Sequence, residues 1–140
     1  MTSIMSTSPA PTSSDPRPYV PERRGILFII SAPSGTGKTT LCKQITASVP
    51  GIWHSVSYTT RQPRPGEEHG REYFFIEEKI FQDMVAKNEF MEYAHVYGNW
   101  YGTPRKALMD KIEQGIDVLL EIDVQGALQI KKKVQDAVYI

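Results

Sequence analysis

The sequence is poor in cysteine, in net charge and in long apolar runs, and each shortage excludes a class of protein. Cys42 is the only cysteine, so an intrachain disulfide is impossible and a reducing cytoplasm is the expected compartment. The 16 Lys and Arg residues balance the 16 Asp and Glu residues, which gives no reason to expect nucleic acid or an anionic membrane as a partner. No apolar run reaches the length of a membrane span, and the first residues lack the apolar core of a secretory signal.

The chain divides into a polar tail and one domain. Residues 1–24 are dominated by Ser, Thr and Pro and cannot bury enough surface to offset their ordering entropy, so a disordered tail is expected. An organelle transit peptide is a weaker alternative, because Asp15 and several prolines disfavour it. Residues 25–140 suffice for one domain with its own core. Because the chain stops within the apolar segment AVYI (137–140), we expect a fragment that lacks the C-terminal part of its domain.

Apolar patterning predicts alternating strands and helices. The segment ILFIIS (26–31) is typical of a strand covered on both faces, and the Gly-rich turn and helix that follow it open an α/β domain. After the polar stretch comes the short apolar segment YFFI (73–76), and the patterns then predict an amphipathic helix around 80–85, a strand at 90–97 and a turn at 98–102. A helix is expected between a Thr103-Pro104 cap and Gly115, followed by a strand at 117–123, a helix from 124 and a strand at 137–140.

Two of these helices have recognisable faces. In the first, Leu41, Ile45 and Val49 recur every fourth residue, and Pro50-Gly51 ends the helix. One face of the last helix carries Val124, Ala127, Leu128 and Lys131.

The segment APSGTGKT (32–39) has the pattern of a phosphate-binding loop, with Ala32 in place of the usual first Gly. Gly35 and Gly37 leave backbone N–H groups free to point at an anion, Lys38 can reach the outer phosphates, and Thr39 offers a hydroxyl to Mg²⁺. A chance Gly-rich turn is the alternative, but the strand before it and the helix after it favour the loop. The residues expected to hold the ATP phosphates are Ala32, Pro33, Ser34, Gly35, Thr36, Gly37, Lys38, Thr39 and Thr40.

The segment SYTTRQPRPGEEHGREY (57–73) is too polar and too rich in Pro and Gly to be a helix or a strand. The planar guanidinium groups of Arg61 and Arg64 can close on one phosphate from two directions, and Tyr73 and Tyr101 can add phenolic donors. A second anion site beside a nucleotide site indicates that the phosphoryl acceptor is itself a phosphate.

The strand at 117–123 ends in Glu121 and Asp123, which are two residues apart and point to the same side of the sheet. They lie near its carboxyl end, where ligands of open α/β sheets bind. Glu121 is a candidate partner of Mg²⁺ through water, opposite Thr39. The alternative is a strand end that turns polar as it reaches the surface.

Several other residues are interpreted as structural. Arg71 is expected to be a rim charge that pairs with Glu68 or Glu72, and Cys42 is expected in the core. The three histidines show no metal-ligand spacing along the sequence. The same interpretation applies to Trp53 and Trp100.

Four segments together resemble the guanylate kinase family over residues 25–140. They are SYTTRQPRPGEEHGREYFF, EFMEYAHVYGNWYGT and LLEIDVQGA, in this order behind APSGTGKT. The resemblance implies a P-loop NTPase-type parallel sheet flanked by helices, with a core at 25–56 and 104–140 and an inserted mixed or antiparallel lobe at about 57–103. It also implies transfer of the γ-phosphate of ATP to GMP or dGMP with Mg²⁺, and catalytic roles for Lys38, Arg61 and Arg64.

The resemblance assigns residues to both ends of GMP. It places Arg61, Arg64, Tyr73 and Tyr101 on the phosphate, and Ser57, Glu92, Thr103 and Asp123 around the guanine. Guanine carries N–H donors on one edge, which a carboxylate can accept. Two of the guanine assignments have an alternative: Glu92 can be the solvent face of an alternating strand, and Thr103, where the family more often has Ser, can be a helix cap.

Two other functions stay open on the sequence. A guanylate-kinase-like module could bind phosphorylated peptides without catalysis, although Lys38 and the guanine set disfavour this. A related kinase could act on a sugar phosphate or another nucleotide, with different residues at positions 92, 103 and 123. Because family members continue into a lid that carries further arginines, we expect the 140-residue chain alone to be a poor catalyst. The sequence leaves the oligomeric state open.

Overall fold

The structure is a computed structural model that describes residues 23–31 and 37–140 as two four-stranded sheets with helices. Nearly all of the predicted tail and the phosphate-loop residues 32–36 lie outside the described residues. The elements are β1 (Leu27–Ser31), α1 (Lys38–Ser48), β2 (Trp53–His54), β3 (Tyr58–Thr59), β4 (Phe74–Phe75), α2 (Glu78–Ala86), β5 (Phe90–Val96), β6 (Asn99–Pro104), α3 (Arg105–Glu113), β7 (Val118–Ile122), α4 (Val124–Lys133) and β8 (Val138–Tyr139).

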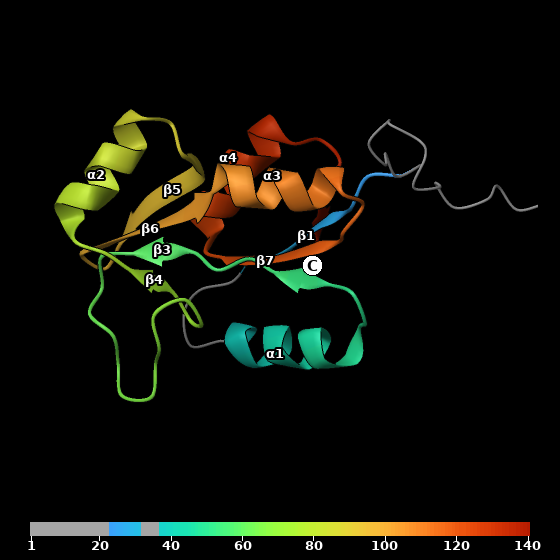
Figure 1. Ribbon diagram of the computed structural model, residues 1–140, viewed down its shortest axis with the longest axis horizontal. Coiled ribbons are helices and arrows are strands. Elements are labelled where there is room, and N and C mark those ends of the chain that lie inside the picture. The colour runs from blue at the N-terminus through green and yellow to red at the C-terminus, as the bar shows by residue number, and fades with distance from the viewer. Residues whose placement is uncertain (1–22, 32–36) are drawn as a thin grey trace, which may run out of the picture.

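The first sheet is parallel throughout, with the strand order β2-β7-β1-β8. α1 covers one face, where Cys42 packs with Ile30 and Leu119, and α3 and α4 cover the other (Figure 1). Burial on both faces explains why its central strands begin with continuous apolar runs, residues 27–30 in β1 and 118–120 in β7. The predicted fold class, a parallel sheet between helices with a second mixed sheet, is therefore confirmed. In the described part of the chain, no helix is long and apolar enough to cross a membrane.

The second sheet is mixed, with the order β4-β3-β6-β5. β3 runs parallel to β4 and antiparallel to β6, and β5 pairs with β6 as a hairpin. Its apolar interior is aromatic: the ring of Phe90 stacks on Phe81 of α2 at 4.6 Å and meets the edge of Tyr58 at 6.0 Å. Gly102 on β6 leaves room for the Phe90 ring, because a Cβ at position 102 would lie 2.7 Å from that ring. The exact limits of the inserted lobe stay a prediction.

The turn predicted at residues 98–102 is wrong beyond Gly98. The hairpin reverses through Tyr97 and Gly98 alone, both with positive φ (50° and 81°), and Val96 already pairs with Asn99. Two consecutive positive φ values are typical of the tight turn that matches the twist of a hairpin. The segment NWYGT lacks the apolar alternation of a strand, so its partners β3 and β5, and not its own pattern, make it β6.

The apolar faces assigned to two helices are only partly buried. Leu41 of α1 and Val49, the residue that follows the helix, are 40% and 45% exposed, whereas Cys42 is fully buried, as the sequence predicts. In α4, Val124 and Leu128 are exposed, and the buried residues are Gly126, Ala127 and Ile130. The small residues Gly126 and Ala127 let α4 approach its neighbours closely, so helix contact follows size as well as hydrophobicity.

The predicted cap at Thr103 is also wrong. Thr103 is the fifth residue of β6, Pro104 occupies the N-cap position, and α3 begins at Arg105 without a side-chain cap. In the hairpin register Thr103 pairs with Glu92 on β5. The strand pairing therefore points its hydroxyl at Glu92 instead of at the helix.

Candidate functional site

A cavity of about 530 Å³ lies between the start of α1, the carboxyl end of β7 and the second sheet. Among the predicted site residues that the structure describes, all but Thr103 line it. They are Gly37, Lys38, Thr39, Thr40, Ser57, Arg61, Arg64, Tyr73, Glu92, Tyr101, Glu121 and Asp123. The tertiary structure thus brings together side chains from positions 37 to 123. The predicted phosphate-binding residues Ala32, Pro33, Ser34, Gly35 and Thr36 lie outside the described residues.

The start of α1 forms one wall of the cavity. Gly37 precedes the helix with φ 87°, a left-handed conformation that favours glycine. Lys38 then places its Nζ 3.5 Å from the carbonyl oxygen of Ile122. The Thr39 hydroxyl donates to Oε2 of Glu121 at 2.6 Å. The positive end of the helix, an ammonium group and a hydroxyl–carboxylate pair therefore meet at the carboxyl end of the parallel sheet.

The polar loop forms the opposite wall through Arg61. Its guanidinium makes two hydrogen bonds to Glu67, at 2.9 Å to Oε1 and 3.0 Å to Oε2, and lies 5.2 Å from the centre of the Tyr73 ring. The hydrogen bonds to Glu67 raise the pKa of Arg61. Oε1 of Glu67 also accepts from the backbone N–H of Arg64 at 2.8 Å. Glu67, which the sequence did not single out, therefore shapes the loop and holds Arg61 in place.

The two other arginines of this loop differ in position. Arg64 is exposed and lines the cavity. Arg71 pairs with Glu68 at 3.0 Å and with Glu72 at 2.8 Å, and it is not among the lining residues. The interpretation of Arg71 as a paired rim charge is confirmed.

Glu92 is buried, with 3% of its surface exposed, so its interpretation as a solvent-facing strand residue is wrong. Its Oε2 accepts a 2.5 Å hydrogen bond from the hydroxyl of Thr103, which is fully buried behind it. Burial raises the pKa of Glu92 to about 7, and the nearby Asp123 adds to the rise. Asp123 caps α4, with its Oδ1 accepting from the backbone N–H of Gly126 at 3.2 Å.

α4 fixes the strand that carries Glu92. The side-chain amide of Gln129 accepts from the backbone N–H of Tyr93 at 3.2 Å and donates to its carbonyl at 2.6 Å. Nζ of Lys133 donates to the carbonyl of Met91 at 2.8 Å. The backbone on both sides of Glu92 is thus bound to the helix. Helical spacing puts positions 126, 129 and 133 near one another on α4, but the sequence carries no signal that their partner is β5.

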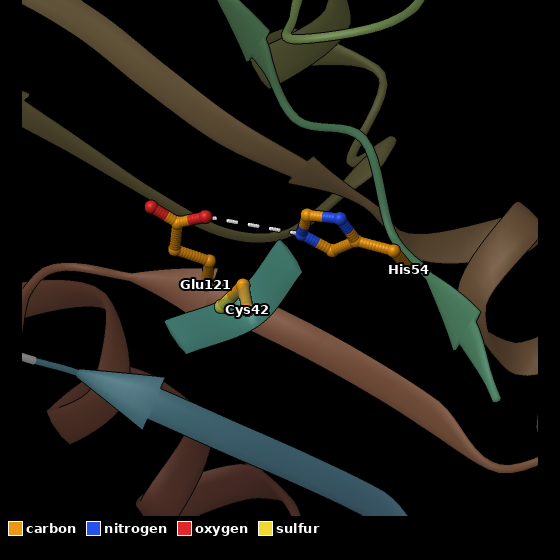
Figure 2. A group of neighbouring side chains, drawn as sticks. All are labelled: Cys42, His54 and Glu121. Carbon is orange, nitrogen blue, oxygen red and sulfur yellow. Dashed lines mark ion pairs between the residues drawn. The ribbon is translucent and has the colours of Figure 1, made fainter. Parts of the chain in front are cut away.

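Figure 2 shows a second polar group beside the cavity, made of Cys42, His54 and Glu121. Their potential ligand atoms all lie within 4.8 Å of one another, and Nε2 of His54 is 3.9 Å from Oε1 of Glu121. Burial raises the pKa of Cys42 to about 12, with Glu121 adding to the rise, and burial lowers the pKa of His54. Sequence spacing could not find this group, because its members come from α1, β2 and β7.

The fold and the cavity identify an α/β protein of the P-loop NTPase type. A helix begins beside the carboxyl end of a parallel sheet, and a second, mixed sheet lies across the cavity from it. The guanylate kinase family model matches residues 24–140, and the chain belongs to that family.

Individual relatives agree with this assignment. The chain is 56% identical over 119 residues to a guanylate kinase of Geobacter metallireducens and 48% identical over 117 residues to one of Clostridium tetani. These alignments cover 85% and 84% of the chain but 59% and 56% of the relatives, so the chain spans a little under three fifths of their length. The crystal structure of guanylate kinase from Anaplasma phagocytophilum matches with a TM-score of 0.71 and 33% identity, over 86% of this chain and 60% of that one.

Proposed function

We propose that the protein phosphorylates GMP with ATP, yielding GDP and ADP. The observation that carries the proposal is one cavity whose opposite walls carry different groups. Lys38 and Thr39 lie at the helix start on one side, and Arg61, Arg64 and Glu92 lie on the other. A donor and an acceptor phosphate bound on these walls would face each other, as in-line phosphoryl transfer requires.

Glu92 supports guanine as the base. Its buried carboxylate, held by Thr103, can accept the N1–H and N2–H₂ donors of guanine, with Asp123 beside it and Ser57 on the same cavity. Adenine presents an acceptor at position 1 and no amine at position 2, so it would offer the carboxylate no donor and leave it with the Thr103 hydroxyl alone. A buried polar group left unpaired can discriminate by about 10⁴-fold or more.

Arg61 and Arg64 are assigned to the GMP phosphate, with Tyr73 and Tyr101 adding phenolic donors. Their positive charge offsets the repulsion that otherwise keeps two phosphates apart. Arg61 is already oriented by Glu67, so little conformational entropy is lost when it binds the anion. Arg64, which is exposed and lines the same cavity, can supply a second guanidinium to that phosphate.

The residues present fit Mg²⁺. The Thr39 hydroxyl and the Glu121 carboxylate lie 2.6 Å apart beside Lys38, and such oxygen groups are the ligands that Mg²⁺ prefers, directly or through water. Bound there with ATP, the ion would supply charge neutralisation on the β- and γ-phosphates. Lys38 orients the same phosphates from the helix start.

The cytoplasmic location stays a prediction from the single cysteine.

Calorimetry on the 140-residue chain tests the proposal. GMP and dGMP are expected to bind at least about 100-fold more tightly than AMP or UMP, because only guanine satisfies Glu92. Binding of a phosphoserine peptide is measured in parallel, because a non-catalytic phosphopeptide-binding module would prefer the peptide to GMP. Preference for the peptide over GMP, or equal binding of GMP and AMP, would refute the proposal. Release of ADP from MgATP that depends on GMP then tests the transfer step, at the low turnover expected of the 140-residue chain.

A further inference from the structure

Cys42, His54 and Glu121 converge from three elements on one face of the parallel sheet. His54 on β2 pairs in register with Leu119 on β7, and Glu121 lies two residues further along the same strand. Residues two apart on a strand share a face, so Glu121 and Leu119 both point toward α1, where Cys42 packs against Leu119. The fold therefore gathers a sulfur, a nitrogen and an oxygen under one helix.

The distances are close to those of a metal centre. The three ligand atoms lie within 4.8 Å of one another, and Nε2 of His54 is 3.9 Å from Oε1 of Glu121. Atoms bound to one tetrahedral zinc ion at about 2.0–2.3 Å are roughly 3.3–3.8 Å apart. Side-chain movements on the order of 1 Å would close the difference. Oε2 of Glu121 meanwhile stays with the Thr39 hydroxyl, so Oε1 is the oxygen that faces the histidine.

We propose that Cys42, His54 and Glu121 form a binding site for a borderline-soft divalent cation of the Zn²⁺ class. One thiolate, one imidazole and one carboxylate suit such an ion and are a poor set for Mg²⁺, which favours oxygen alone. The side chains of Glu121 and His54 are 15% and 33% exposed, so the ion has a path from solvent, and water can fill the fourth position. On binding, the Cys42 thiol gives its proton to solvent and a sulfur–metal bond forms.

This metal site goes beyond the proposed kinase function and does not depend on it. One consequence does rest on that function: an ion held by Glu121 would compete for the carboxylate assigned to Mg²⁺. Zn²⁺ would then act as an inhibitor at the edge of the nucleotide site. The decisive experiment is therefore done without nucleotide, so that its failure and the failure of the kinase proposal can be told apart.

Titration of the 140-residue chain with Co²⁺ alone tests the site. We expect the intense visible bands of a tetrahedral ion, a near-ultraviolet thiolate-to-cobalt band, and displacement of Co²⁺ by one equivalent of Zn²⁺. Since the sequence has one cysteine, a thiolate band can arise only at Cys42. Cys42→Ser should remove that band, and His54→Gln should weaken Co²⁺ binding at least about tenfold.

His95→Gln is the matched control. His95 is exposed on β5 in the other sheet, with its ring centre 4.6 Å from that of Trp100, so its removal should leave Co²⁺ binding unchanged. Circular dichroism without metal establishes that each variant is folded, and the partly exposed His54 provides a test even if the buried Cys42 tolerates no change. Absence of the thiolate band in the wild type, or equal Co²⁺ affinity for wild type and His54→Gln, would overturn the proposal.

Discussion

The backbone of Gly126 on α4 lies directly against the carboxylate of Glu92 on β5. A Cβ atom at position 126 would be 2.1 Å from Oε1 and 2.9 Å from Cδ of Glu92, which is impossible without movement. The same glycine donates its N–H to Asp123. One position without a side chain therefore lets two acidic groups share the end of the cavity.

Gly126→Ala is expected to displace Glu92 and to weaken GMP binding at least about 100-fold. Overpacking of this kind also costs roughly 1–3 kcal/mol of stability. Calorimetry with GMP and chemical unfolding measure the two effects. Leu128→Ala, on the exposed face of the same helix, should change neither. GMP affinity that survives Gly126→Ala would show that Glu92 does not need its observed position.

GMP binding should depend on pH through Glu92. Because burial raises the pKa of Glu92 to about 7, much of it is protonated in the free protein near pH 6, and a protonated carboxyl cannot accept both guanine N–H groups. Affinity for GMP should therefore rise between pH 5.5 and pH 8. The phosphate of GMP titrates in the same range, so Glu92→Gln is the reference: its pH dependence must be shallower than that of the wild type.

The free energy of unfolding should also depend on pH through Glu92. Between the ordinary pKa of 4.5 and the raised value of about 7, the folded state keeps the Glu92 proton that the unfolded state has lost. The free energy of unfolding should therefore fall as pH rises through this window, by roughly 3 kcal/mol from this group. Urea unfolding of wild type and Glu92→Gln at pH 5 and pH 8 isolates the contribution. A difference between the two proteins that is the same at both pH values would contradict the raised pKa.

Arg64 and Arg71 offer a matched pair of substitutions in one loop. Arg64 lines the cavity, whereas Arg71 is held by Glu68 and Glu72 outside it. Arg64→Ala should weaken GMP binding by about 2–4 kcal/mol, the scale of a lost charge-assisted contact with phosphate. Arg71→Ala should leave GMP affinity within about threefold, as expected for an exposed rim charge. Equal effects of the two substitutions would remove Arg64 from the phosphate site.

Sequence reasoning predicted side-chain pairing correctly where the partners are near one another in the sequence. Arg71 beside Glu68 and Glu72 pairs as expected, since all three lie within five positions of one another. The interpretations of Thr103 as a helix cap and of Glu92 as a solvent-facing strand residue were wrong for the opposite reason. Both rested on local patterns, whereas the pairing of the two residues across the hairpin turns both side chains inward.

The sequence by itself determined the parallel α/β architecture, the buried central strands and which polar residue types would collect near the cavity, because apolar periodicity and glycine placement act over a few neighbouring residues. Only the tertiary structure decided that Glu67 would hold Arg61, that Gly126 would make room for Glu92, and that Cys42, His54 and Glu121 would meet. The Arg61–Glu67 contact lies within one loop, whereas the other two join residues from separate elements, and their distances depend on how closely helices and sheets pack. The packing distance depends on the whole assembled core, so no single segment of the sequence determines it.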